Sequence, residues 1–218
     1  MIFVIPDLLN GSELSTIKSI LTEAKFVDGK LTAGWYAKPV KHNQQLPTGD
    51  LQQQLKQQIQ TALSNNPLFQ TAIRPKAIHN LLFSRYEVGM SYGRHVDNAF
   101  MGGWRSDVSF TLFLSSPNNY QGGELIIESA DDEKAYKLEA GSVLVYPSTT
   151  LHRVEPVTAG IRLAAVGWVQ SLIRDSSKRE ILFDLETVKR VMYNQSGKTA
   201  EFDLLAKSIS NLLRQWAE

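Results

Sequence analysis

Seven short stretches of β-type sequence follow one another between residues 78 and 169, and this pattern restricts the possible folds more than any other feature of the chain. The stretches are residues 78–86, 108–114, 124–127, 135–138, 142–146, 152–155 and 162–169. Turn-forming residues such as Ser116-Pro117-Asn118-Asn119 and Ala140-Gly141 separate them. Many short strands at this spacing predict a two-sheet sandwich or a barrel, and the double-sheet jelly roll is one such fold.

Helical patterns precede the β-rich part. After a short strand at residues 2–5, apolar residues recur at three- and four-residue spacing over 12–26 and again over 51–63. We expect Ser12 and Asp50 to cap these two helices, because both residue types are favoured at helix N-termini. The two helices are expected to buttress one of the sheets.

Two further apolar stripes, at 181–192 and 202–216, predict a helical pair after the β-rich part, with a break at the Asn-Gln-Ser-Gly sequence of 194–197. This pair could pack on the β-rich body or on a second copy of the chain in a homodimer, and the sequence leaves both open. The chain is therefore predicted to be α+β and mainly β. Its expected parts are residues 1–77 as N-terminal support, 78–172 as the core and 173–218 as a C-terminal helical appendage.

His95 and Asp97 lie two positions apart on an extended segment, so their side chains should point to the same side. His152, from a distant strand, would complete one triangular face of an octahedral metal and leave three positions open. Two imidazoles and one carboxylate in this arrangement are typical of non-heme Fe(II) oxygenases. His42 and His79 have no metal-ligand partners at a useful spacing and are interpreted as ordinary residues.

Several motifs around these residues match one known group of proteins. The motifs are Arg85-Tyr86-Glu87-Val88-Gly89, Tyr92-Gly93-Arg94-His95-Val96-Asp97-Asn98, Arg105-Ser106-Asp107, Gly122-Gly123-Glu124-Leu125, and His152 followed by Arg162. Over roughly residues 78–172 the chain resembles the Fe(II)/2-oxoglutarate-dependent dioxygenases of the prolyl/lysyl hydroxylase-like group, most closely the bacterial PKHD-type hydroxylases. The C-terminal tail is similar to the small helical appendage of that group.

The resemblance implies a double-stranded β-helix (a jelly roll) with the metal between its sheets. The implied ligands of Fe(2+) are His95, Asp97 and His152. Arg162 would hold the C5 carboxylate of the co-substrate 2-oxoglutarate, because a guanidinium binds a planar carboxylate through two parallel hydrogen bonds. Tyr86 and Tyr92 are expected near the co-substrate. The implied reaction is O2-dependent hydroxylation of a substrate C–H bond with release of succinate and CO2, supported by L-ascorbate.

Other positions around the implied site could also contribute to it. Phe113 stands where some relatives have a co-substrate-binding tyrosine, which puts a tyrosine hydrogen bond from this strand in doubt. Ser109 or Thr111 could add a hydroxyl to the same wall. Residues 98–104 form a glycine-containing, aromatic loop that could be a mobile lid or could simply pack into the mouth. Residues 30–47 are a candidate second wall of the substrate entrance.

Charged residues and glycines close to the motifs are assigned structural roles. Arg94 and Arg153 flank expected ligands and should point away from the metal, because strand side chains alternate. Arg105 and Asp107 are interpreted as a structural ion pair in preference to part of the substrate mouth. Gly122-Gly123 should be a turn and no phosphate loop, since no helix start with lysine and serine or threonine follows it.

Composition excludes several classes of function. The 23 basic and 22 acidic residues nearly cancel, which argues against a nucleic-acid partner or an anionic membrane surface. The absence of cysteine excludes disulfides, zinc–thiolate sites and thiol nucleophiles, and it fits a reducing cytoplasm. The N-terminus lacks the pattern of a signal peptide, and no apolar stretch approaches the ~18 residues of a membrane span. We therefore predict a cytoplasmic protein without membrane partners.

Two other functions remain open from the sequence. One is a non-catalytic sensor of iron or 2-oxoglutarate that signals to a partner protein through the C-terminal helices. The other is a cupin-like metal enzyme that does not use 2-oxoglutarate, against which Arg162 argues. The primary substrate, whether peptidyl or a small molecule, is not defined by the sequence, because a fold does not determine a substrate.

Overall fold

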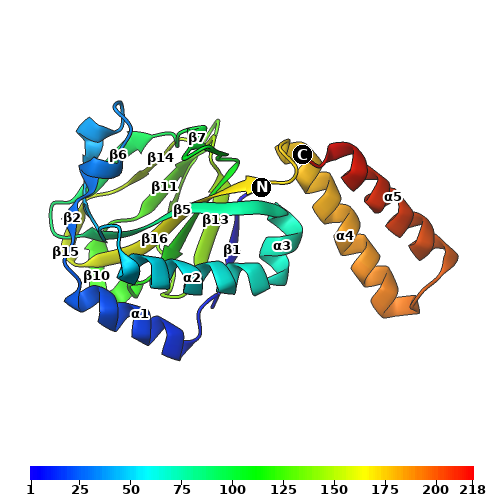
Figure 1. Cartoon of the computed structure of the whole chain (residues 1–218), viewed down its shortest axis with the longest axis horizontal. Coiled ribbons are helices and arrows are strands. Elements are labelled where there is room, and N and C mark those ends of the chain that lie inside the picture. Colours follow the sequence, from blue (N-terminus) through cyan, green and yellow to red (C-terminus); the bar gives the residue numbers. More distant parts are fainter.

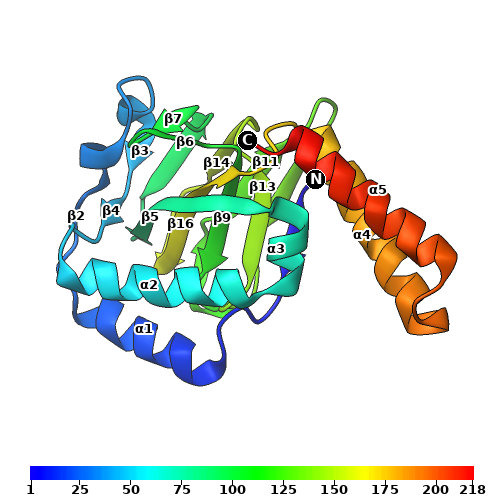
Figure 2. The same ribbon diagram turned by 45° about the vertical axis from the view of Figure 1, so that its right-hand side comes forward.

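The computed structural model of the protein describes residues 1–218, and its body consists of two facing β-sheets with helices against one of them (Figures 1 and 2). The larger sheet has seven strands in the order β1-β13-β9-β16-β5-β4-β2. In that order the strands are Phe3–Ile5, Val143–Pro147, Val108–Phe113, Arg162–Ser171, Pro75–Tyr86, Gln44–Gln45 and Val27–Asp28.

The smaller sheet has five strands in the order β12-β11-β14-β6-β3. In that order they are Glu133–Tyr136, Leu125–Glu128, His152–Val154, Ser91–His95 and Lys41–His42. Two short pairs lie beside the sheets: β10 (Tyr120–Gly122) with β15 (Val157–Gly160), and β7 (Phe100–Met101) with β8 (Trp104–Arg105). Every strand pairing is antiparallel.

The two sheets meet across a layer of buried side chains. This layer comprises Tyr86, Phe113, Leu125, Ile127, Leu144, Tyr146, Val154 and Val157. Strand β9 lies in the middle of the larger sheet, and all six of its residues are buried because one face meets the smaller sheet and the other meets the helices. The structure confirms the predicted mainly-β, two-sheet fold of the jelly-roll type.

Three helices precede the β-rich part: α1 (Gly11–Glu23), α2 (Asp50–Asn65) and α3 (Pro67–Ile73). Figure 2 shows α1 and α2 lying across the outer face of the larger sheet. Fully buried residues at helical spacing, such as Leu55, Ile59 and Leu63 of α2, join the same core as Phe83 and Phe110 of the sheet. Burying each such side chain stabilises the fold by about 1.5–3 kcal/mol. The expected buttress is therefore confirmed.

The predicted starts of the first two helices are wrong. Asn10, and not Ser12, caps α1: its side-chain Oδ1 accepts hydrogen bonds from the backbone N–H groups of Ser12 and Glu13, and Glu13 reaches back to the Asn10 N–H. This is a complete capping box. The cap of α2 is Gly49, which has no side chain to offer, and Asp50 is the first residue of that helix.

The seven β-type stretches all correspond to strands, whereas the shortest elements were not anticipated. Helix α3 and the two-residue strands β2, β3 and β4 are too short to show a period in the sequence. Their place depends on pairing with distant segments; β3, for example, is held by β6.

The C-terminal helices α4 (Ser176–Ser196) and α5 (Ala200–Trp216) form a hairpin that projects from the body (Figure 1). The chain breaks where expected, at Gly197, which takes a φ of 67° that glycine adopts without strain. The two apolar stripes pack mainly against each other, around Ile173, Leu182 and Ile209. Arg74 and Glu186 join the hairpin to the body through an ion pair of 3.4 Å.

The assignment of the α1 cap can be tested by two alanine substitutions in the same turn. Asn10→Ala should lower the free energy of unfolding by about 1 kcal/mol, because it removes the acceptor for two N–H groups. Ser12→Ala is the matched control and should change stability by only a few tenths of a kcal/mol. Urea unfolding of both variants measures the difference, and an equal loss in the two variants would contradict the assignment.

Candidate active site

His95 and His152 are brought together by strand pairing in the smaller sheet. His95 is the last residue of β6, His152 is the first of β14, and the two are direct partners in the register. Their rings face the interior with centroids 4.3 Å apart. Directly opposed residues on one face of an antiparallel pair are the closest neighbours a sheet can provide, so the register itself builds this half of the site.

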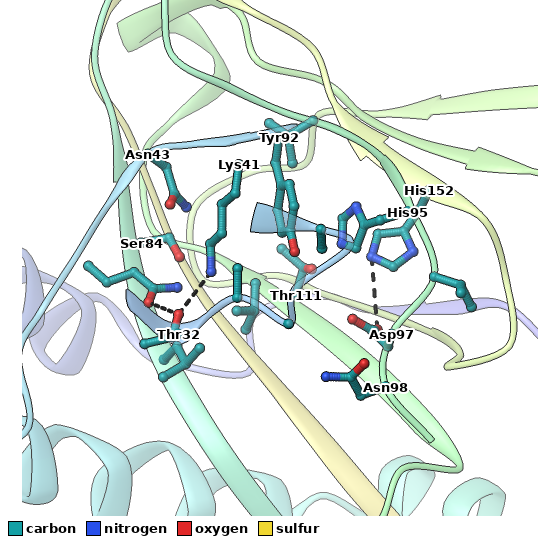
Figure 3. A pocket seen from close by; sticks show the side chains of 18 of the residues that line it. Thr32, Lys41, Asn43, Ser84, Tyr92, His95, Asp97, Asn98, Thr111 and His152 are labelled. Atoms are coloured by element: carbon teal, nitrogen blue, oxygen red, sulfur yellow. Dashed lines mark hydrogen bonds and ion pairs between the residues drawn. The ribbon is translucent and has the colours of Figure 1, made fainter. Parts of the chain in front are cut away.

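Asp97 follows His95 by two residues and reaches the same place (Figure 3). One donor atom from each of His95, Asp97 and His152 lies within 4.8 Å of the other two. The His152 Nε2 and Asp97 Oδ2 atoms are 3.9 Å apart. All three residues predicted from the sequence therefore converge, and the structure shows no other cluster of three such side chains.

The hydrogen bonds of both imidazoles fix which nitrogen faces the centre. The Nδ1 atom of His95 is 2.8 Å from the carbonyl oxygen of Gly93, and that of His152 is 2.9 Å from the carbonyl oxygen of Thr150. A carbonyl only accepts, so each Nδ1 carries the proton and each Nε2 has a free lone pair. Burial, and then the neighbouring His152, lower the pKa of His95 to about 4. His95 is therefore neutral, as a metal ligand must be, at physiological pH.

Two serine hydroxyls, linked by hydrogen bonds, orient the carboxylate of Asp97. Ser109, in strand β9 of the opposite sheet, donates its hydroxyl to Asp97 Oδ2 at 2.6 Å and lies 2.8 Å from the hydroxyl of Ser148. Both serines are buried. Of the two hydroxyls weighed from the sequence, Ser109 thus contacts the carboxylate, whereas Thr111 lines the cleft and lies 3.4 Å from the Tyr146 hydroxyl.

These donors fit a single divalent metal ion of the Fe(II) type. Two neutral imidazoles and one carboxylate, each oriented by a second hydrogen bond, are the ligand set of mononuclear iron oxygenases. Because all three donors come from one side, the opposite side is left for co-substrate and O2.

The three residues open into a cleft of about 750 Å³, including its mouth. Arg162, at the start of β16, lines the same cleft and is only 1% exposed. Its Nε and Nη2 atoms have no hydrogen-bond partner within the protein, and its guanidinium lies over the rings of Tyr86 at 5.0 Å and Phe113 at 5.6 Å. A buried cation without an acidic partner is costly, so this guanidinium is suited to bind a carboxylate that enters the cleft.

The two tyrosines expected near the co-substrate both line the cleft. Tyr86 is buried beneath Arg162, and Tyr92 stacks on the ring of His95 at 3.7 Å between centroids. Burial raises the pKa of both phenols. They consequently stay protonated and can donate hydrogen bonds.

The charged residues beside the ligands have the structural roles expected of them. Arg94 pairs with Glu128 at 2.7 Å and Arg153 with Glu133 at 2.7 Å, both on the outer face of the smaller sheet. Arg105 binds Asp107 at 2.7 Å, and the Asp107 carboxylate also accepts from the backbone of Ser171. Gly122 ends strand β10 with positive φ, as a turn requires.

Two segments, residues 30–47 and 98–104, were expected at the entrance of the cleft. The structure confirms the expectation for the first and rejects one interpretation of the second. Within residues 30–47, eight residues line the cleft, which confirms a second wall, although Trp35 and His42 of that segment are exposed. Residues 98–104 form the hairpin of β7 and β8, and Phe100 is 68% exposed, so this ring does not pack into the mouth as one interpretation held. Mobility of this hairpin remains a prediction.

Sequence reasoning missed three residues of the second wall. Lys41, Asn43 and Gln45 are all buried and line the cleft, whereas His42 between them is exposed. Their spacing of two is the alternation of an extended chain. This signal was present in the sequence, but alternating polar residues are usually a sign of a solvated edge.

Comparison with known proteins now defines the class. The profile of the 2OG-Fe(II) oxygenase superfamily matches residues 81–170. Among solved structures, the chain is similar to a prolyl-4-hydroxylase of Pseudomonas putida, with a TM-score of 0.53 and 22% identity over 78% of this chain and 92% of that one. It is also similar to a prolyl hydroxylase of Trichoplax adhaerens, with a TM-score of 0.54 and 15% identity over 83% and 86% of the two chains. These likenesses show a shared jelly-roll fold.

Closer relatives define the family. The chain is 68% identical to a PKHD-type hydroxylase of Gloeothece citriformis and 63% identical to one of Picosynechococcus, and each alignment covers both chains completely. The chain belongs to the PKHD-type hydroxylases. It is an Fe(II)- and 2-oxoglutarate-dependent dioxygenase, and this membership favours the enzyme over both the metabolite sensor and the cupin-like alternative. None of its helices has the length and apolar character needed to cross a membrane.

The hydroxyl that holds Asp97 offers a test of the metal centre. Ser109→Ala should weaken metal binding by roughly 10- to 100-fold, since groups that orient a metal ligand typically have effects of this size. Electron paramagnetic resonance of Mn(II), a redox-stable substitute for Fe(II), measures the affinity. Ser106→Ala is the control, because Ser106 is also buried but its hydroxyl has no partner. Equal affinity of the two variants would contradict the role of Ser109.

Proposed function

We propose that His95, Asp97 and His152 hold the Fe(II) and that Arg162 binds the C5 carboxylate of 2-oxoglutarate. The observation that carries this proposal is the buried guanidinium of Arg162, which has no acidic partner in the protein and lines the same cleft as the three metal donors. A planar carboxylate fits its free Nε and Nη2 donors as a bidentate pair.

Each residue of the site then has a defined task. When bound, the iron supplies the O2 activation and C–H oxidation, and the protein supplies position and shielding. Arg162 fixes one end of 2-oxoglutarate, so that its keto-acid end is directed toward the three donors. Tyr86 and Tyr92 are uncharged donors beside the co-substrate. Ser109 keeps the Asp97 carboxylate turned toward the metal.

The sheets keep bulk water away from the reacting groups. His95 and His152 are 7% and 5% exposed. Across the mouth, the Tyr36 hydroxyl donates to Asn98 Oδ1 at 2.6 Å and lies 3.1 Å from the Val96 carbonyl oxygen. This contact joins the second wall to the segment that carries Asp97. Excluding water in this way strengthens the interactions inside the site.

Further features of the protein remain predictions from the sequence and the family. We propose that L-ascorbate sustains turnover by keeping the iron reduced. Residues 78–172 are proposed as the catalytic core, with 1–77 and 173–218 as support and appendage. The cytoplasmic location and the homodimer also remain predictions, although exposed apolar side chains such as Val188 and Leu204 on the C-terminal hairpin would suit a contact between two copies.

The assignment of Arg162 is tested by anaerobic titration of the Fe(II)-loaded protein with 2-oxoglutarate, followed by its visible charge-transfer absorption band. Arg162→Leu should weaken 2-oxoglutarate binding roughly a hundredfold or more, because two charge-assisted hydrogen bonds of about 1.5–3 kcal/mol each are lost. Succinate formation in air should fall accordingly, while Fe(II) binding should be kept.

Arg85→Leu is the matched control. Arg85 lies in β5 directly before Tyr86, is partly exposed and pairs with Glu87, so its loss should leave the affinity for 2-oxoglutarate unchanged. If Arg162→Leu bound 2-oxoglutarate as well as Arg85→Leu did, the proposed co-substrate site would be wrong.

A further inference from the structure

Lys41 is a buried ammonium group in the cleft that the proposed function leaves unused. The residue is 4% exposed and its side chain lines the same cleft as the metal donors (Figure 3). Its Nζ atom donates one hydrogen bond, to Thr32 Oγ1 at 2.9 Å, although an ammonium has three donors. None of the ion pairs in the structure includes Lys41. A buried charge with so few partners has the capacity to bind an anion.

The groups around Lys41 are arranged to keep its ammonium in place. The Thr32 hydroxyl donates to the side-chain oxygen of Gln45, so it presents its lone pairs to Lys41. Gln45 is buried, as is Asn43, whose amide nitrogen and oxygen both lack partners. Figure 3 shows Thr32, Lys41 and Asn43 together on the side of the cleft away from His152. The cluster thus offers one cation and one further N–H donor group to a ligand.

Strand pairing places this cluster next to the metal donors. Lys41 in β3 is the register partner of Tyr92 in β6, and its Nζ lies 5.2 Å from the centre of the Tyr92 ring. The other neighbour of that ring is His95, stacked at 3.7 Å. In Figure 3, Lys41 and His95 lie on the two sides of Tyr92. A ligand held by Lys41 would therefore lie one aromatic ring away from a metal ligand.

Arg162 and Lys41 serve different parts of the cleft. Arg162 contacts Tyr86 and Phe113, whereas Lys41 contacts Thr32 and Tyr92, and the two cations share no neighbour among these contacts. Burial lowers the pKa of Lys41 to about 8, against the opposing effect of Asp97 and Asp28. The ammonium form still predominates at neutral pH, so the cleft presents two separate cationic groups.

Two anionic ligands would neutralise the net positive charge of the metal-loaded cleft. With the two histidines counted as neutral metal ligands, Lys41, Arg162 and Asp97 are the only charged side chains that line the cleft at neutral pH. With Fe(II) bound, the cleft carries three net positive charges. 2-Oxoglutarate brings two negative charges and leaves one positive charge unbalanced. A substrate with a single carboxylate would neutralise it.

We propose that Lys41 is a second carboxylate-binding group of the active site and that the primary substrate carries a free carboxylate near the carbon that is oxidised. This inference rests on the proposed function, which assigns Arg162 to the co-substrate. The substrate class is therefore a small organic or amino acid, or the C-terminal residue of a peptide. An internal residue without an acidic side chain would not satisfy Lys41, because its backbone carboxyl group is an amide.

The test uses the protein loaded with Zn(II), which is redox-inert, and with 2-oxoglutarate. The probes are propionate for a small acid, N-acetyl-triglycine for a peptide C-terminus, and propionamide as the neutral equivalent of propionate. Binding is followed by saturation-transfer NMR of the probe and, in ¹³C-lysine-labelled protein, by the ε-carbon signal of Lys41, identified by its loss in Lys41→Gln. Propionate should bind saturably and shift this signal, and propionamide should do neither.

Two variants test whether propionate binds at Lys41. Lys41→Gln should weaken propionate binding at least tenfold, while Lys38→Gln, at an exposed lysine just ahead in the same segment, should not change it. Binding of N-acetyl-triglycine at Lys41 would favour a peptide C-terminus as the source of the carboxylate, and binding of propionate alone would favour a small acid. Propionate binding that persists in Lys41→Gln, or that propionamide equals, would overturn the proposal.

The same samples separate this inference from the proposed function. Lys41→Gln should bind 2-oxoglutarate with wild-type affinity. If it lost 2-oxoglutarate while Arg162→Leu kept it, Lys41 would be the co-substrate site and the substrate inference would fail. If 2-oxoglutarate did not bind to the wild-type protein at all, the proposed function would fail, whatever the Lys41 signal showed with propionate.

Discussion

The register between β6 and β14 is the constraint on which the rest of the site depends. It sets His95 opposite His152 and directs both rings inward. The residues next to them, Arg94 and Arg153, then point outward and bind glutamates of β11 and β12. A slip by one residue would exchange the two faces. It would bury the arginines without their partners and expose both imidazoles. The ion pairs on the outer face and the proposed metal ligands on the inner face thus specify the same alignment.

The two sheets contribute different things to the centre. The smaller sheet provides the imidazoles, and the larger one provides Ser109, which holds the Asp97 carboxylate, and Arg162. Asp97 itself lies beyond the end of β6 and depends on the opposite sheet for its orientation. The distance between the sheets is set by large buried side chains such as Phe113 and Tyr146. The geometry of the candidate metal centre therefore depends on how the core between the two sheets packs.

The sequence predicted the features that are encoded locally. Most of the longer strands show a β-type pattern of their own, although β6 and β15 did not, and the His-x-Asp motif and Arg162 are recognisable from their residue types and spacing. The α1 cap was misplaced because Asn10 and Ser12 are both good caps and only the structure distinguishes them. Lys41 was overlooked because the alternation of polar residues around it usually marks a solvated edge and does not predict burial. Its environment is produced by a two-residue strand that pairs across the chain with Tyr92.

The short strands β3 and β4 belong to different sheets, although only Asn43 separates them. One residue of the wall, Lys41, is therefore attached to the smaller sheet, and another, Gln45, to the larger one. The proposed iron donors and Arg162 lie in other segments of the chain. On the assignment proposed above, ligand preference and oxidative chemistry occupy separate stretches of sequence. A few substitutions between residues 41 and 45 could change which molecule is accepted while leaving the oxidising centre intact, which gives such a scaffold a short route to new specificities during evolution.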